Sequence, residues 1–168
     1  MKPVVSIIMG STSDLPVVEK ACKFLDEMQI PFEVNALSAH RTPDAVEQFA
    51  RGAKERGIKV IIAAAGMAAA LPGVIAASTT LPVIGVPIKG MLDGLDAMLS
   101  IIQMPPGIPV ATVGVNGAQN AAILAVEMIA IADNETAEKL AAYKASLKEK
   151  IEKANRDLAE VKYQYKTN

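Results

Sequence analysis

Residues 4–28, VVSIIMGSTSDLPVVEKACKFLDEM, decide the fold because their hydrophobic period changes once, at a glycine-containing loop. The segment 4–10 is a short apolar run that ends in glycine, which is typical of a strand buried on both faces. Beyond Ser13 the apolar residues recur every three or four positions, as they do on one face of a helix. Ser13 or Asp14 is expected to cap that helix. This stretch therefore predicts a strand followed by a helix.

The same alternation continues along the chain. Further strands are expected at 30–37, 60–66, 81–87 and 108–113, and further helices at 43–56, 72–79, 93–104 and 118–132. Buried strands that alternate with helices at this spacing form βαβ units, which have right-handed crossovers and parallel strands. The expected fold is a three-layer α/β/α domain with a central parallel sheet, of the flavodoxin or Rossmann kind.

The composition changes after residue 133. The segment 135–166 is rich in Lys, Glu and Ala, and its apolar residues fall at helical spacing. It predicts a long amphipathic helix with a solvated charged face and an apolar stripe that packs on the domain or on another subunit. We therefore expect an α/β domain over residues 1–133 and a C-terminal helix over 134–168, with the last few residues frayed.

The composition also limits the classes of partner. The chain has 17 Lys and Arg against 18 Asp and Glu, 4% aromatic residues and no Trp. Such a chain has no global positive field and few stacking side chains, so nucleic acid is not expected as a partner. No apolar run suits a membrane span or a signal peptide, which predicts a cytoplasmic location. The single cysteine, Cys22, belongs to no metal-ligand pattern and is expected to be buried in the first helix.

In parallel sheets ligands bind beyond the carboxyl ends of the strands, so the loops there are the expected site. The first loop, GSTSD at 10–14, combines glycine, three hydroxyl groups and a helix N-terminus, which suits phosphate, although an N-cap and a turn explain it equally well. It lacks the P-loop ending, and the chain has no GxGxxG, so neither a nucleoside triphosphatase nor a dinucleotide enzyme is supported. Asp14 either caps the helix or accepts hydrogen bonds from ligand hydroxyls.

The second loop, LSAHRTPD at 37–44, holds the only histidine of the chain, His40. Arg41 offers paired donors to a phosphate, and a histidine can take up or release a proton near neutral pH. A lone histidine in a loop is more often structural or merely solvent-facing. Because Ser38, His40 and Arg41 are expected at the same sheet edge as the first loop, the residues alone support a catalytic and an incidental histidine about equally.

The third loop, 64–73, is almost free of polar side chains. Gly66 and Gly73 permit unusual dihedral angles, and the alanines let a flat ligand approach the backbone, but tight helix packing explains the same residues. Further along, Lys89, Asp93 and Asp96 could reach the site, although solvated surface is the favoured interpretation of Lys89. Asn116 either caps a helix or touches a ligand. The loops together indicate a small phosphorylated ligand and one proton-transferring histidine, with no metal or redox cofactor.

Six motifs in the chain are specific in order and spacing: MGSTSD, SAHRTPD, AGMAAALPGVIAA, LPVIGVP, LDGLDAMLSIIQMPPGIPVATVGV and NAAILAVEMIA. Together they resemble the PurE family of purine biosynthesis, which comprises the N5-carboxyaminoimidazole ribonucleotide mutases and related aminoimidazole ribonucleotide carboxylases. The resemblance covers roughly residues 4–133. It implies a homo-octamer with active sites between subunits. It also implies a mutase that needs no cofactor and moves a carboxylate from the exocyclic nitrogen to C4 of the imidazole, through carbon dioxide held in the site.

The resemblance also assigns residue roles. His40 is the implied catalytic acid/base, because decarboxylation needs a proton delivered to nitrogen and recarboxylation needs one removed from C4. Ser11, Ser13 and Asp14 would bind phosphate and ribose, and Ser38 and Arg41 the phosphate end. The full set implied to bind substrate is Gly10, Ser11, Ser13, Asp14, Ser38, Ala39, Arg41, Gly66, Met67, Ala68, Ala69, Ala70 and Leu71, of which residues 66–71 would frame the heterocycle and the carboxylate.

One position departs from the family pattern. Mutases of this family usually have histidine where this chain has Ala70. Three explanations stay open: the loop's backbone suffices for activity, the substrate has changed, or the position was substituted deliberately. The expected function is the mutase. The alternatives are a carboxylase or decarboxylase of a related ribonucleotide, and a catalytically impaired homologue that only binds the ribonucleotide.

Overall fold

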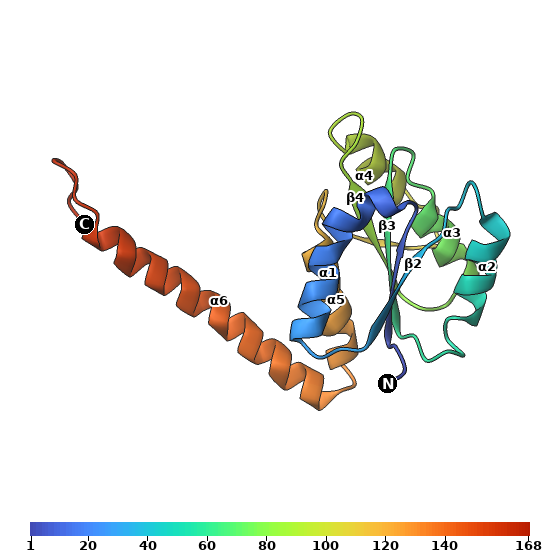
Figure 1. The fold of residues 1–168 in the computed structure, drawn as a ribbon, viewed down its shortest axis with the longest axis horizontal. Helices are drawn as coiled ribbons and strands as arrows, with labels where there is room; N and C mark the ends of the chain where they lie inside the picture. The colour runs from blue at the N-terminus through green and yellow to red at the C-terminus, as the bar shows by residue number, and fades with distance from the viewer.

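A parallel five-stranded sheet forms the centre of the molecule (Figure 1). The computed structural model describes residues 1–168. The strands are β1 (Val5–Met9), β2 (Phe32–Ala36), β3 (Val60–Gly66), β4 (Val83–Ile88) and β5 (Ala111–Thr112), in the order β2-β1-β3-β4-β5. Strand order reverses between β1 and β3, and such a switch point is where open α/β sheets bind ligands.

Helices cover both faces of the sheet, so the predicted three-layer α/β/α fold is confirmed. The helical elements are the short 3₁₀ turn η1 (Thr12–Asp14), α1 (Leu15–Glu27), α2 (Pro43–Gly52), α3 (Leu71–Ser78), α4 (Leu95–Ile102), α5 (Ala118–Ala130) and α6 (Asn134–Glu160). One hydrophobic core lies between the sheet and α1 and α5, and a second lies between the sheet and α2, α3 and α4 (Figure 1). None of these helices combines the length and apolarity needed to cross a membrane.

The central strands show why the apolar runs are continuous. Every residue of β1 and β4, and all of β3 except Gly66, is buried. A strand between two helical layers has no solvent face, so its sequence does not alternate between polar and apolar residues. β2 lies at the edge of the sheet and remains partly exposed along its whole length.

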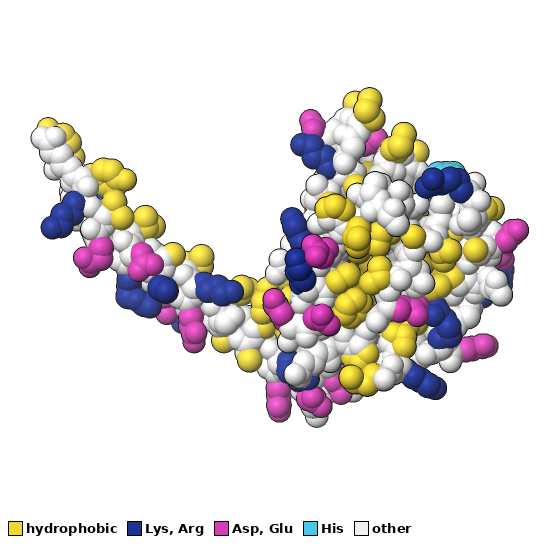
Figure 2. Space-filling view, in the orientation of Figure 1, with side chains coloured by type: hydrophobic (Ala, Val, Ile, Leu, Met, Phe, Trp, Pro, Cys, Tyr) yellow, Lys and Arg dark blue, Asp and Glu magenta, His cyan; other side chains and the backbone are white.

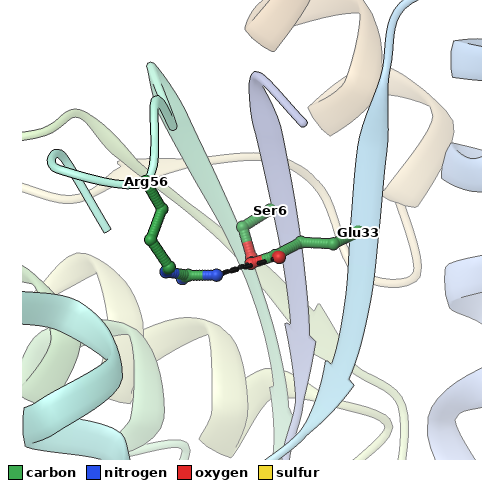
Figure 3. Close-up of polar contacts among 3 residues, drawn as sticks. All are labelled: Ser6, Glu33 and Arg56. Carbon is green, nitrogen blue, oxygen red and sulfur yellow. Dashed lines mark hydrogen bonds and ion pairs between the residues drawn. The ribbon is translucent and has the colours of Figure 1, made fainter. Parts of the chain in front are cut away.

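One polar cluster ties the edge strand to the centre (Figure 3). Ser6 of β1 is fully buried, and its hydroxyl donates a 2.9 Å hydrogen bond to Glu33 Oε1 on β2. Arg56 Nη1 donates to both Glu33 oxygens, at 2.8 and 2.9 Å, and its guanidinium lies 4.7 Å from the centre of the Phe49 ring. The Glu33 carboxylate thus joins two strands and the segment that leads into β3.

Several predicted boundaries are wrong for identifiable reasons. β5 has only two residues, because Pro109 has no N–H to donate to a strand ladder. α4 begins at Leu95 rather than at residue 93, because Leu92 and Asp93 adopt left-handed conformations with φ of 50° and 54°. α2 ends at Gly52, four residues early. Cys22 is half-buried rather than buried, and desolvation raises the pKa of its thiol.

α6 packs on the domain only through its first turns. Asp133 caps it by accepting a hydrogen bond from the Thr136 N–H, Leu140 is buried, and the Tyr143 ring meets Phe24 edge-on with 4.9 Å between centroids. Beyond these contacts the helix extends away from the sheet (Figure 1), and the residues after Glu160 are not helical. The apolar stripe continues along the extended part, where Leu147, Ile151 and Leu158 are exposed.

The Glu33 cluster predicts a stability difference between two ion pairs. Glu33→Ala leaves Ser6 and Arg56 without their acceptor, and we expect it to lower the free energy of unfolding by about 2 kcal/mol. Glu47→Ala removes an exposed partner of Arg51 and should cost less than about 0.5 kcal/mol. Urea unfolding of the two variants and the parent measures both values. Equal losses would mean that the partly buried Glu33 cluster is no stronger than a surface pair.

Candidate active site

The strand-end loops surround one cavity of about 670 Å³ at the carboxyl edge of the sheet. Every residue predicted for the site lines it: His40, together with Gly10, Ser11, Ser13, Asp14, Ser38, Ala39, Arg41, Gly66, Met67, Ala68, Ala69, Ala70 and Leu71. Four lining residues were not predicted: Ala65, Ile88, Lys89 and Gly90. The cavity therefore spans the ends of four neighbouring strands, β2, β1, β3 and β4.

The first loop is held by Ser11 rather than by the predicted caps. Ser11 Oγ accepts hydrogen bonds from the Ser13 N–H at 3.3 Å and from the Ser13 hydroxyl at 3.0 Å. Asp14 stands at the N-cap of α1, but its side chain makes no capping bond. Asp14 thus occupies the predicted N-cap position, but the side-chain capping bond is made by Ser11 at the 3₁₀ turn that precedes the α-helix. The Asp14 carboxylate is left with acceptor capacity toward the cavity.

Burial raises the pKa of Asp14, while hydrogen bonds with Ser13 and Ser11 partly oppose that effect. A carboxylate that loses water without gaining a cation is destabilised in its charged form. In the unliganded protein the charged Asp14 carboxylate therefore has an unfavourable desolvation free energy, which a ligand that donates hydrogen bonds to it would reduce. Such a cost is typical of binding sites rather than of structural caps.

The second loop is tied to the first by Arg41. Its Nη2 donates a 2.9 Å hydrogen bond to the Gly10 carbonyl, and its Nε and backbone N–H donate to Ser38 Oγ at 3.3 and 3.2 Å. Thr42 closes the turn by bonding both backbone groups of Ser38. The guanidinium is therefore oriented before any ligand arrives, and its Nη1 group is free of hydrogen bonds within the chain.

His40 lies between the residues that this network fixes. Its side chain is exposed, lines the cavity and makes no hydrogen bond within the chain. Neither ring nitrogen is engaged in holding the loop together, since Ser38, Arg41 and Thr42 do that. Both nitrogens are available to exchange a proton with a molecule in the cavity.

The third loop forms the apolar part of the cavity. Ala69 and Leu71 are buried, Met67 and Ala68 are exposed, and Ala70 is the N-cap of α3 with no side-chain capping bond. The left-handed residue in this loop is Met67, with φ of 56°.

For the two glycines of the third loop, the structure favours tight packing over unusual dihedral angles, the two explanations that the sequence left open. Neither Gly66 nor Gly73 has a positive φ. A Cβ on Gly73 would lie 3.0 Å from Met104 Cε, which shows that close packing accounts for this glycine.

Lys89 and Asn116 contact each other, which the sequence analysis did not predict. The Lys89 N–H donates a 2.9 Å hydrogen bond to Asn116 Oδ1, and the Asn116 N–H bonds the Pro87 carbonyl at 2.8 Å. Asn116 thus holds the end of β4 and neither caps a helix nor lines the cavity. The signal for Lys89 was its position directly after a buried strand, the same signal that identified the other loops.

This fold and site define a class: a flavodoxin-like α/β protein with a cavity over the switch point of a parallel sheet. The model of one family, AIR carboxylase, matches residues 4–150. The chain belongs to this AIR carboxylase family, which confirms the PurE resemblance.

Individual relatives agree with this assignment. The chain is 58% identical over 147 residues to an N5-carboxyaminoimidazole ribonucleotide mutase of Pyrococcus abyssi, covering 87% of this chain and 84% of that protein. It is 56% identical over 140 residues to a phosphoribosylaminoimidazole carboxylase of Candida glabrata, covering 83% of this chain but only 25% of that longer protein. A crystal structure of Treponema denticola PurE superposes with a TM-score of 0.83 at 31% identity, covering 93% of this chain and 98% of that one.

The raised pKa of Asp14 gives a pH-dependent prediction. Above the ordinary value of 3.8, the unfolded chain releases this proton more readily than the folded protein, so Asp14 lowers stability as pH rises through its folded pKa. Asp14→Asn should therefore raise the melting temperature of the unliganded protein at pH 7, and the gain should shrink as pH falls toward 3.8. Thermal unfolding across that pH range tests this.

Asp157→Asn, on the exposed part of α6, serves as the control and should not change the melting temperature appreciably. The same Asp14→Asn variant should bind a ribonucleotide less well. A lower melting temperature at pH 7 would instead mean that Asp14 stabilises the unliganded fold.

Proposed function

We propose that this protein is an N5-carboxyaminoimidazole ribonucleotide mutase, an isomerase of purine biosynthesis, with His40 as its acid/base. The observation that carries the proposal is the joining of the first two loops: Arg41, fixed to Gly10 and Ser38, lies beside an unengaged His40 over the switch point of the sheet. An oriented guanidinium and a free imidazole in one cavity are what proton transfer on a phosphorylated substrate requires.

The polar half of the cavity would hold the ribose phosphate. Arg41 offers its free Nη1 group to phosphate oxygens, and Ser11, Ser13 and Ser38 surround it with hydroxyls. Charge-assisted hydrogen bonds of this kind are the stronger ones. The Asp14 carboxylate accepts hydrogen bonds from ribose hydroxyls, and these replace the hydrogen bonds to water that burial removes.

The apolar half would hold the imidazole and its carboxylate. The N5–carboxyl bond breaks, carbon dioxide leaves N5 with a proton delivered in its place, and C4 then attacks carbon dioxide and loses its own proton. One imidazole can deliver the first proton and accept the second. The alanines of residues 68–70 and Leu71 provide small apolar walls, which limit the access of water and retain carbon dioxide.

Ala70 is consistent with this division of roles. At the position where mutases of this family usually have histidine, the chain offers only a methyl group and the N-terminus of α3. The helix N-terminus carries partial positive charge that favours a carboxylate nearby. We therefore propose that His40 performs both proton transfers and that the third loop contributes backbone and shape.

We also propose that the chain acts as a homo-octamer in the cytoplasm. Five large apolar residues are exposed in the segment before α4 and along the helix, here called the α4 patch: Met91, Leu92, Leu95, Leu99 and Ile102. Hydrophobic side chains also line α6 (Figure 2). Contiguous exposed apolar surface of this kind marks protein interfaces. The α4 patch continues from Lys89 and Gly90 of the cavity, so a neighbouring subunit there would help enclose the site.

The mutase activity is tested by the interconversion of N5-carboxyaminoimidazole ribonucleotide and its 4-carboxy isomer. We expect the parent to catalyse it and His40→Asn to lose about 10²-fold or more in kcat, because no other lining side chain is an imidazole. Retained binding of aminoimidazole ribonucleotide by His40→Asn shows that the site is intact. Turnover of aminoimidazole ribonucleotide with bicarbonate alone would instead identify a carboxylase, and binding without any turnover an impaired homologue.

An Ala70→His variant measured in the same assay separates the explanations for Ala70. If His40 suffices, the variant and the parent should have rates within about threefold of each other, which is less than 1 kcal/mol in barrier height. A gain of tenfold or more on adding the histidine would mean that the parent lacks part of its catalytic machinery.

The octamer predicts a light-scattering mass about eight times the 17.6 kDa of the chain. Leu95→Asp together with Leu99→Asp places two charges in the α4 patch and should reduce that mass. Tyr165→Asp, near the C-terminus and also exposed, is the matched control and should leave it unchanged. A mass near that of one chain for the parent would refute the oligomer.

A further inference from the structure

We propose that Lys89 determines specificity for the carboxylated imidazole, by binding its carboxylate at the end of the cavity opposite Arg41. The inference rests on the proposed function. It assigns a ligand group to the Lys89 ammonium, which takes no part in the proposed binding of the phosphate. Lys89 and Arg41 are the two lining residues with permanent positive charge. The proposed substrate carries negative charge at both of its ends, a phosphate on one and a carboxylate on the other.

The strand order places the two cations at opposite ends. Arg41 follows β2 and Lys89 follows β4, and the order β2-β1-β3-β4 puts three strand spacings between them. At about 4.8 Å for each spacing, the carboxyl ends of β2 and β4 lie about 14 Å apart. A ribonucleotide whose phosphate lies at Arg41 would extend across β1 and β3 and bring its heterocycle toward β4.

The backbone of Lys89 is fixed on two sides. Ile88 pairs with Gly66 in the sheet, and Asn116 Oδ1 accepts the Lys89 N–H at 2.9 Å. Gly94 packs so closely that a Cβ there would lie 3.2 Å from Lys89 Cα. The Cα of Lys89 is thus held in place, so the ammonium can change position only by rotation about the bonds of the side chain.

The resting partner of the ammonium is weakly held. Lys89 Nζ lies 3.1 Å from Asp93 Oδ1, with 59% and 88% of the two side chains exposed. Ion pairs this exposed contribute little to stability, so exchanging Asp93 for a ligand carboxylate costs little. Asp93 does not line the cavity and holds the ammonium only weakly.

No other charged side chain serves this end of the cavity. The third loop contributes only glycine, methionine, alanine and leucine, and Ala70 has no polar group. Arg41 is assigned to the phosphate, and His40 is assigned to proton exchange with N5 and C4 of the heterocycle. A carboxylate on the heterocycle therefore has Lys89 as its one cationic side chain, whereas an imidazole without a carboxylate has no use for it.

The test compares the affinities of two ribonucleotides that differ only in the carboxylate. Calorimetric titration of Lys89→Gln should show the 4-carboxy compound binding about tenfold or more weakly, as expected for a lost hydrogen bond to a charged group. Aminoimidazole ribonucleotide should bind within about twofold of the parent. Lys89→Arg should restore most of the discrimination. Arg41→Ala is the matched control and should weaken both ligands alike, because both carry the phosphate.

Asp93→Asn provides a change in the opposite direction. Asparagine tolerates the left-handed φ of 54° at this position, and the substitution frees the ammonium from its resting partner. The 4-carboxy compound should then bind about two- to threefold more tightly, without a change for aminoimidazole ribonucleotide. Lys89→Gln that weakens both ligands equally, or neither, would overturn the role of Lys89 even if the parent remains an active mutase. A parent that binds neither ribonucleotide would overturn the proposed function and this inference with it.

Discussion

The parallel pairing of β1 with β3 is the constraint on which the rest of the structure depends. Val5–Met9 lie in register with Val60–Ala64, and these residues are buried on both faces. Strands without a solvent face require helices on both sides, and parallel strands require crossovers that bring every carboxyl end to one edge. The loops after β1, β2, β3 and β4 meet at one cavity for that reason. The position of the site thus follows from the burial of two strands.

The loops form a polar half and an apolar half of the cavity because their sequences differ. The first two bring hydroxyls, a carboxylate, an imidazole and a guanidinium, and hydrogen bonds from Arg41 join them into one unit. The third brings small apolar residues and a helix N-terminus. A polar half suits the common phosphoribosyl part of a ligand, and an apolar half suits a reaction in which charge leaves one atom and returns to another. Lys89 adds the charge that the apolar half lacks.

The hydrophobic period was enough to predict the layers and nearly all the elements, since burial dictates it directly. The strand-end rule was enough to bring together the predicted site residues. What failed depends on conformation that tertiary contacts select. Ser11 became the capping residue because a 3₁₀ turn precedes α1, and Met67 rather than Gly66 took the left-handed conformation. Lys89 is exposed, as expected of a surface lysine, and it also lines the cavity. The hydrogen bond from its N–H to Asn116 Oδ1 could not be predicted, because it depends on how β4 and the segment before α5 pack together.

The long C-terminal helix divides the chain into parts of unequal cooperativity. Up to Tyr143, α6 packs on the core of α1 and α5 through Leu140 and Tyr143, so we expect its amide hydrogens to exchange more slowly than those further along. Further along, the helix depends on its own hydrogen bonds and on exposed pairs such as Lys148 with Glu152, and an isolated helix of that length is marginal in water. The second half of α6 therefore opens and closes independently of the sheet until another surface covers it. While that half of α6 is uncovered, the core unfolds as one unit, and loss of structure in the distal helix does not indicate that the core has unfolded.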